Sequence, residues 1–317
     1  MDRSRQSVDP LLSRLAGWTA LAAATELIVL RIGTRTSIHI PGLDVLTGPL
    51  SVVSELGRLA FYLTLVLLLA LSVRLIIFLG RDYQFHNVLP IGALALVLVG
   101  SALATTGLAS PHFAGWMGLG AAGLAAAGVL NEGRSAIPMI LWSLAFSVTA
   151  SPVLLQDAGG LAGSEMAVLA TGGELLAVIA LLSLPLLLEV RLSRTGALWG
   201  IAIAVFITAA FWASPSTSTI LALWSVGVPG SLPALAYGAG AASATITIWT
   251  AWQSERPLLA AAVTLLLTGG FGLISTYQTT LVVVGLVLAG TGIRSLDELA
   301  FGASESANGK QTLTIGR

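Results

Sequence analysis

Acidic side chains inside long apolar stretches are the residues of this sequence best suited to proton or cation chemistry. Glu174 follows Thr171 and two glycines in the middle of the apolar stretch 165–190, and Glu26 follows Thr25 in an earlier stretch. A charged group at the centre of a bilayer costs at least about 2.5 kcal/mol, so such a residue is a candidate functional site. Glu174 and Thr171 form the first candidate ion-binding site, with a structural hydrogen bond to a neighbouring helix as the equal alternative. For Glu26 we favour a side chain that reaches toward the headgroups.

A cluster of helix-breaking residues at 225–231 is the second candidate site. Pro229 and Gly230 lie in the overlong apolar stretch 218–251. Proline removes a backbone donor and clashes with the preceding turn. We therefore expect a broken or re-entrant helix near 219–233, with exposed backbone groups of the kind that transporters use to bind ions and substrates. A break without any role in transport is the alternative.

Other chemistries have little support in the residue content. The chain has no cysteine, which excludes disulfides and thiolate metal sites, and its single lysine, Lys310, lies in a polar tail. The three histidines, His39, His86 and His112, fall in predicted loops, and the acidic residues are scattered. We therefore predict no metal site, no cofactor and no clustered catalytic set. A formal net charge of zero without a basic cluster also argues against nucleic-acid binding.

The composition indicates the elements that must position these residues. Charged residues make up only 9% of the chain and hydrophobic ones 56%, and the mean hydropathy is +0.91. Soluble domains carry roughly 25% charged residues. Apolar runs of about 20 residues indicate transmembrane helices, so we predict an all-α, polytopic membrane protein. Its ten predicted spans are 15–31, 57–79, 88–107, 113–130, 136–156, 165–190, 196–214, 218–251, 257–274 and 279–294.

Basic residues predict the orientation of these spans. Twelve of the fifteen fall on one side of the predicted topology, and only Arg31, Arg35 and Arg58 fall on the other. By the positive-inside rule, both termini are cytoplasmic. The loops after the third, fifth, seventh and ninth spans carry no Lys or Arg. The sequence thus predicts an inner-membrane protein with its N- and C-terminal segments on the same side.

The predicted organisation is a single transmembrane domain over 15–294, preceded by a cytoplasmic segment over 1–14. Residues 32–56 are expected to form an outer interfacial segment. A polar cytoplasmic tail over 295–317 is expected to begin with a short helix at 296–301. The polar run 275–280 is interpreted as the ninth loop.

Two stripes of small residues at four-residue spacing predict close helix packing. We favour packing within one bundle, and a seam between copies or subunits is the alternative. The stripes are Ala114, Gly118, Ala122 and Ala126 in one span, and Ala234, Gly238 and Ala242 in another.

Ten spans divide into halves at 15–156 and 165–294, and five spans per half would invert the second half. This layout resembles that of the drug/metabolite transporter superfamily, which implies secondary transport of an ion or a small solute. In such a carrier, Glu174 would titrate or bind a cation while the broken eighth helix gates access.

A second resemblance points to a different class. The stretch 43–66 and the apolar run around Trp116 are similar to early helices of antiporter-like subunits of respiratory complex I. The chain departs from that family in length, in its lack of buried lysines, and in Met117, which stands where the family has an acidic residue. The alternative function is therefore a non-catalytic membrane subunit. The expected partners are membrane lipid together with other subunits or a second copy of the chain.

Overall fold

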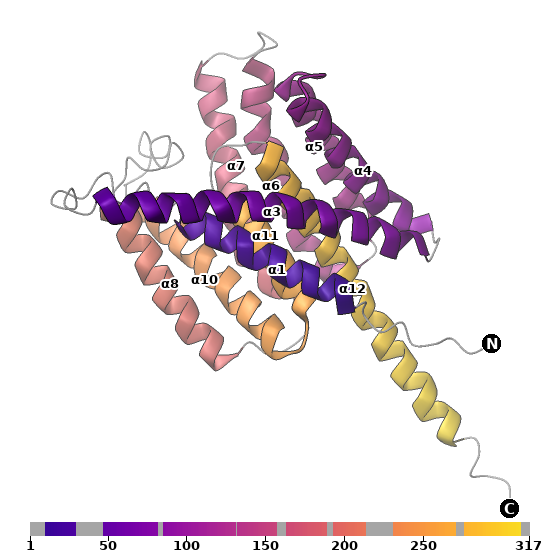
Figure 1. Ribbon diagram of the computed structural model, residues 1–317. Coiled ribbons are helices and arrows are strands. Elements are labelled where there is room, and N and C mark those ends of the chain that lie inside the picture. The colour runs from indigo at the N-terminus through magenta and orange to yellow at the C-terminus, as the bar shows by residue number, and fades with distance from the viewer. Residues whose placement is uncertain are drawn as a thin grey trace, which may run out of the picture.

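Helices make up almost all of the chain that the computed structural model describes, which is residues 10–29, 47–81, 85–130, 132–156, 163–188, 193–213, 231–270 and 276–311. Ten α-helices occur in these ranges (Figure 1). They are α1 (Pro10–Glu26), α3 (Thr47–Arg81), α4 (Phe85–Thr105), α5 (Pro111–Ala127), α6 (Ala136–Gln156), α7 (Gly163–Ser183), α8 (Arg194–Ala213), α10 (Ser231–Gln253), α11 (Pro257–Gly270) and α12 (Thr276–Gln311). The prediction of an all-α protein is confirmed.

Three of the described helices are long and apolar enough to cross a membrane: Glu55–Arg81 in α3, Asn87–Thr105 in α4 and Thr276–Ile293 in α12. Shorter apolar helices occur at Leu175–Leu187, Arg194–Phe206 and Pro257–Gly269. The structure thus supports membrane helices for part of the chain.

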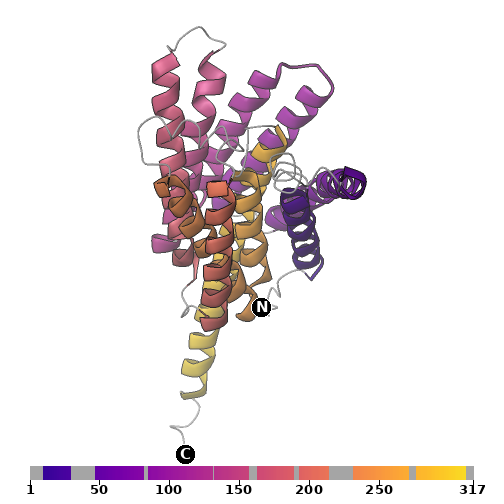
Figure 2. The same cartoon turned by 90° about the vertical axis from the view of Figure 1, so that its left-hand side faces the viewer.

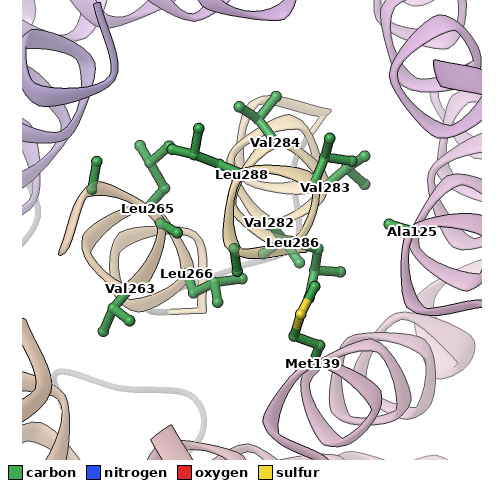
Figure 3. Packing of buried hydrophobic residues seen from close by; sticks show 14 of the residues in the cluster. Ala125, Met139, Val263, Leu265, Leu266, Val282, Val283, Val284, Leu286 and Leu288 are labelled. Atoms are coloured by element: carbon green, nitrogen blue, oxygen red, sulfur yellow. The ribbon is translucent and has the colours of Figure 1, made fainter. Parts of the chain in front are cut away.

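The first half of α12 forms the centre of the molecule. In its apolar segment 89% of the residues are buried inside the protein. The corresponding share is 33% in α3 and 28% in α4. Helices α11, α5 and α4 pack around it. In Figure 3, valine and leucine side chains of α12 lie between those of α11 and the facing residues Ala125 of α5 and Met139 of α6. The most central helix is therefore enclosed by protein.

Helix α3 lies at the periphery and across the other helices. It crosses the width of the molecule in Figure 1, and it is seen close to its end in Figure 2, where α7 and α12 are seen along their length. Leu59, Tyr62 and Val66 are each more than 60% exposed. An apolar surface of this extent is typical of a face covered by lipid or by another protein.

Glycines allow the closest approaches between helices. A Cβ on Gly200 of α8 would lie 2.7 Å from Cγ1 of Ile246 in α10, and one on Gly238 of α10 would lie 2.9 Å from the carbonyl oxygen of Ala204 in α8. In the other stripe, Gly118 of α5 faces Thr279 of α12. These glycines pack inside the molecule, which agrees with the prediction of packing within one bundle.

Two helices extend beyond the ends of the predicted spans. Residues 47–56 form the first turns of α3, so this part of the expected interfacial segment is continuous with the following helix. Helix α12 continues to Gln311, so neither an end at 294 nor a separate short helix at 296–301 is observed. No proline occurs between Thr276 and Gln311 to end the helix. The last turns of α12 project beyond the other helices in both views (Figures 1 and 2).

Proline does shape the end of α7. The α-helix ends at Ser183, and a 3₁₀ turn over Leu184–Leu187 follows, with Pro185 in its first turn. Because proline lacks an N–H group, the regular α-helical hydrogen bonding cannot continue through this position. The predicted span 165–190 therefore ends in a tighter turn.

Candidate functional site

The first turns of α12 bring polar side chains into the apolar centre of the molecule. The run 275–280 was interpreted as a loop, but α12 begins at Thr276, and this interpretation is corrected. Gln278, Thr279 and Thr280 are only 5%, 3% and 7% exposed. We call these three residues and Ser101 of α4 the α12 polar cluster.

A hydrogen bond between helices ties this cluster together. The Oγ1 atom of Thr280 lies 3.0 Å from the Oγ atom of Ser101. Thr280 also donates to the carbonyl oxygen of Thr276 at 2.8 Å. A threonine hydroxyl has one hydrogen atom, so Ser101 is the donor in the bond to Thr280. The hydrogen bond from Ser101 to Thr280 thus joins α4 to α12.

Residues of three further helices surround the start of α12. The methyl group of Thr279 lies against Gly118 of α5, where a Cβ atom would not fit. A Cβ on Gly269 of α11 would lie 3.1 Å from the backbone oxygen of Gln278. The rings of Tyr277 and Phe61 of α3 meet edge to face, with centroids 4.8 Å apart. The polar cluster therefore lies where α3, α4, α5 and α11 meet α12.

Most other buried hydroxyl groups are occupied within their own helix. Thr64, Ser72 and Thr291 each donate to the carbonyl oxygen one turn earlier, at 2.7–2.8 Å. This local bond satisfies a hydroxyl donor in an apolar environment without any partner helix. The hydroxyl group of Ser101 instead lies beside Thr280 of another helix, and that of Ser243 in α10 donates to the carbonyl oxygen of Leu182 in α7.

Glu26 is buried in the structure, whereas the sequence favoured a side chain that reaches toward the headgroups. It is 3% exposed and is the last residue of α1, a helix that packs against α3 and α11. A π-helical turn follows at 27–29. Its carboxyl group is therefore enclosed by protein.

The remaining predicted site residues either lie in α7 or fall outside the residues that the structure describes. Thr171 and Glu174 fall in α7, whose neighbouring residue Gly173 packs tightly on the backbone of Thr149 in α6. The side chains of Thr171 and Glu174 are outside the described residues. So are Pro229 and Gly230, and with them the predicted break at 219–233. These candidates stay predictions.

Metal-binding groups were also sought in the ranges that the structure covers. Within them, no three His, Asp or Glu residues come together as a set that could hold an ion. The α12 polar cluster consists of neutral amide and hydroxyl groups. Such groups exchange hydrogen bonds with a polar solute or offer oxygen atoms to a weakly hydrated cation.

Comparison with known proteins finds no match for this chain among protein-family models, curated proteins or solved structures.

Proposed function

We propose that this chain is a multi-pass membrane protein that carries an ion or a small polar solute across the bilayer. In this proposal the chain is embedded in the inner membrane, with both termini on the cytoplasmic side. The exposed apolar surface of α3 and the apolar character of the helices support a lipid environment. The proposed binding position is the α12 polar cluster.

The observation that carries the proposal is the burial of this cluster in the most enclosed helix. An amide or hydroxyl group in an apolar interior needs hydrogen bonds to offset its desolvation cost, as Thr280 has with Ser101 and Thr276. Packing alone would favour apolar residues at Gln278, Thr279 and Thr280, as at Leu281–Val284, which are fully buried. A polar side-chain set at the meeting point of five helices is suited to hold a solute that shares its hydrogen bonds.

A matched pair of threonine variants in proteoliposomes tests the carrier function. Thr280→Val keeps the shape of the side chain and removes the hydroxyl group that Ser101 uses. Thr291→Val removes a buried hydroxyl of the same helix that bonds only locally to Val287 at 2.8 Å. We expect Thr280→Val to lower solute or ion flux about tenfold, the equivalent of about 1.4 kcal/mol, and Thr291→Val to leave it near the unmodified level.

Equal flux in both variants, in a preparation that transports, would remove the α12 polar cluster from the path. Absence of flux for every tested ion and solute would count against a carrier altogether. The screen therefore begins with protons, sodium, potassium and small neutral solutes.

A membrane subunit of a larger complex is the second candidate function. The last turns of α12 project beyond the other helices, and α3 presents an extended apolar surface. Both features suit contact with another membrane protein. Native mass spectrometry after purification in mild detergent distinguishes the two functions. Stoichiometric partner chains favour the subunit, whereas a monomer or homodimer favours the carrier.

A further inference from the structure

Helix α8 has an exposed apolar face. Its main neighbour among the described helices is α10, and Figure 1 shows α8 at the edge of the molecule beside α10. Leu198, Ile201 and Val205 are each more than 60% exposed. Residues three or four positions apart share one side of a helix. We call these three residues the α8 apolar face.

Tryptophan side chains gather at the end of this face that is nearer to the start of α8. The rings of Trp199 in α8 and Trp249 in α10 have centroids 6.3 Å apart. Trp199 and Trp252 are 53% and 67% exposed. Indole groups favour the interface between hydrocarbon and headgroups. The tryptophans therefore mark the level at which the α8 apolar face meets the headgroup region.

Two arginines lie at the same end of the α8–α10 pair. Arg194 is the first residue of α8 and is exposed. The backbone N–H of Ser193 donates to Oγ1 of Thr250 at 3.2 Å, which places the start of α8 beside the last turn of α10. Arg256 follows α10, and its backbone N–H donates to the carbonyl oxygen of Ala251 at 2.9 Å. Both side chains therefore start next to the end of α10.

The guanidinium group of Arg256 is partly enclosed without an acidic partner among the residues that the structure describes. Its Nη1 atom is buried and has no hydrogen-bond partner there, while the residue as a whole is partly exposed. The neighbouring Glu255 is exposed, and the ion pair found in the described ranges joins Arg58 to Glu55 instead. A partly desolvated charge is costly when it is not compensated. An anion from outside the chain would compensate it.

We propose that this end of the α8–α10 pair binds the headgroup of an anionic phospholipid. The phosphate accepts hydrogen bonds from the accessible part of the Arg256 guanidinium, whose planar shape suits phosphate oxygens. Arg194 adds a second positive charge. The acyl chains run along the α8 apolar face, past the tryptophans.

The length of this surface fits one lipid leaflet. Helix α8 rises about 17 Å from Arg194 to Val205, and half of the hydrocarbon core is about 15 Å thick. An acidic protein segment would satisfy the arginines, but it would leave the α8 apolar face uncovered. The order of charge, aromatic ring and apolar surface therefore favours a phospholipid. The inference rests on the membrane location in the proposed function and does not require transport.

Native mass spectrometry of the purified protein titrated with lipid tests the proposal. The probes are phosphatidylglycerol and phosphatidylcholine with identical acyl chains, because both contain a phosphate but only the first has a net charge. We expect the unmodified protein to bind phosphatidylglycerol about tenfold more tightly, since each basic residue near an anionic lipid contributes about fivefold. Equal affinity for the two lipids would overturn the proposal, and this comparison needs no variant.

Arginine variants locate the site. Arg256→Gln should lower the affinity for phosphatidylglycerol about fivefold and leave that for phosphatidylcholine unchanged. Arg256→Lys keeps the charge and should lose less. The matched control is Arg134→Gln, which removes an exposed arginine from the turn between α5 and α6. Equal losses in Arg256→Gln and Arg134→Gln would mean attraction by overall charge and would contradict a site at Arg256.

Competition identifies the source of the phosphate. Inorganic phosphate at the concentration of the lipid should not displace phosphatidylglycerol, because it lacks acyl chains for the α8 apolar face. Complete displacement would overturn the lipid in favour of free phosphate. A protein that copurifies with the chain and blocks phosphatidylglycerol binding would overturn it in favour of a partner subunit.

None of these measurements depends on transport. Equal affinity for both lipids in a protein that transports would contradict this inference alone. A preference for phosphatidylglycerol in a protein that transports nothing would contradict the carrier function alone.

Discussion

The hydroxyl groups of Ser101 and Thr280 form a hydrogen bond between two helices. Thr280 uses its hydrogen for Thr276, and its oxygen remains to accept from Ser101. Thr64 and Ser72 also satisfy their hydrogens one turn back. A hydroxyl of this kind needs no second helix, so its sequence position says little about a site. At the scale of single residues, the contact between helices is the informative feature.

A double-mutant cycle measures the energy of this contact. Thr280→Val leaves the Ser101 donor without its acceptor, and we expect it to lower the free energy of unfolding by about 0.5–1.5 kcal/mol. The coupling energy with Ser101→Ala should be about 0.6 kcal/mol, typical of hydrogen bonds between membrane helices. Unfolding in mixed detergent micelles provides the measurement. Additive effects of the two substitutions would mean that the bond contributes nothing to stability.

Pairs of helices are held at short distance by glycine at selected positions. Gly118 of α5 faces Thr279 of α12, and Gly285 of α12 faces Leu266 of α11. Small residues let helix backbones approach and increase van der Waals contact where lipid supplies no hydrophobic drive. Gly123 of α5 differs, because a Cβ there would meet nothing within 4 Å.

Two alanine substitutions in α5 test this distinction between elements. A Cβ at Gly118 would collide with the methyl group of Thr279, whereas one at Gly123 would meet nothing within 4 Å. We expect Gly118→Ala to destabilise the protein by about 1–3 kcal/mol through overpacking. Gly123→Ala should stabilise it by up to about 1 kcal/mol, because alanine favours a helix over glycine. Equal melting temperatures would contradict the close packing of α5 on α12.

The whole molecule places its most apolar surfaces in two different environments. The first half of α12 is enclosed by other helices, whereas α3 exposes an apolar face along its length. The enclosed helix is protected from lipid, and the exposed one suits contact with lipid or with a partner protein. In the proposed topology, successive connecting segments lie on alternate sides of the membrane.

Single cysteines test this topology, because the chain has none of its own. Leu108 follows α4 and is 78% exposed, and Gln253 ends α10 and is exposed. The topology places position 108 outside and position 253 inside. In intact cells, a membrane-impermeant maleimide should label Leu108→Cys and should label Gln253→Cys only after permeabilisation. The reverse pattern would invert the orientation.

Local composition and periodicity determine much of this protein. Apolar runs predict α6 to the residue and α4, α5, α8 and α11 to within four residues at each end, because intrahelical hydrogen bonds depend on the local chain. The same local information suggested the close approach of Gly118. The polarity of the run 275–280 wrongly predicted a loop. No glycine or proline separates Thr276 from the apolar run after it.

Tertiary structure alone decided which residues are enclosed. The burial of Gln278, Thr279 and Thr280 requires α4, α5 and α11 to surround the start of α12. The inward position of Glu26 likewise requires α3 and α11 to cover one face of α1. In a chain this apolar, hydropathy is nearly the same on all sides of a helix. The side that faces protein is therefore fixed by contacts between residues far apart in sequence, such as Ser101 and Thr280.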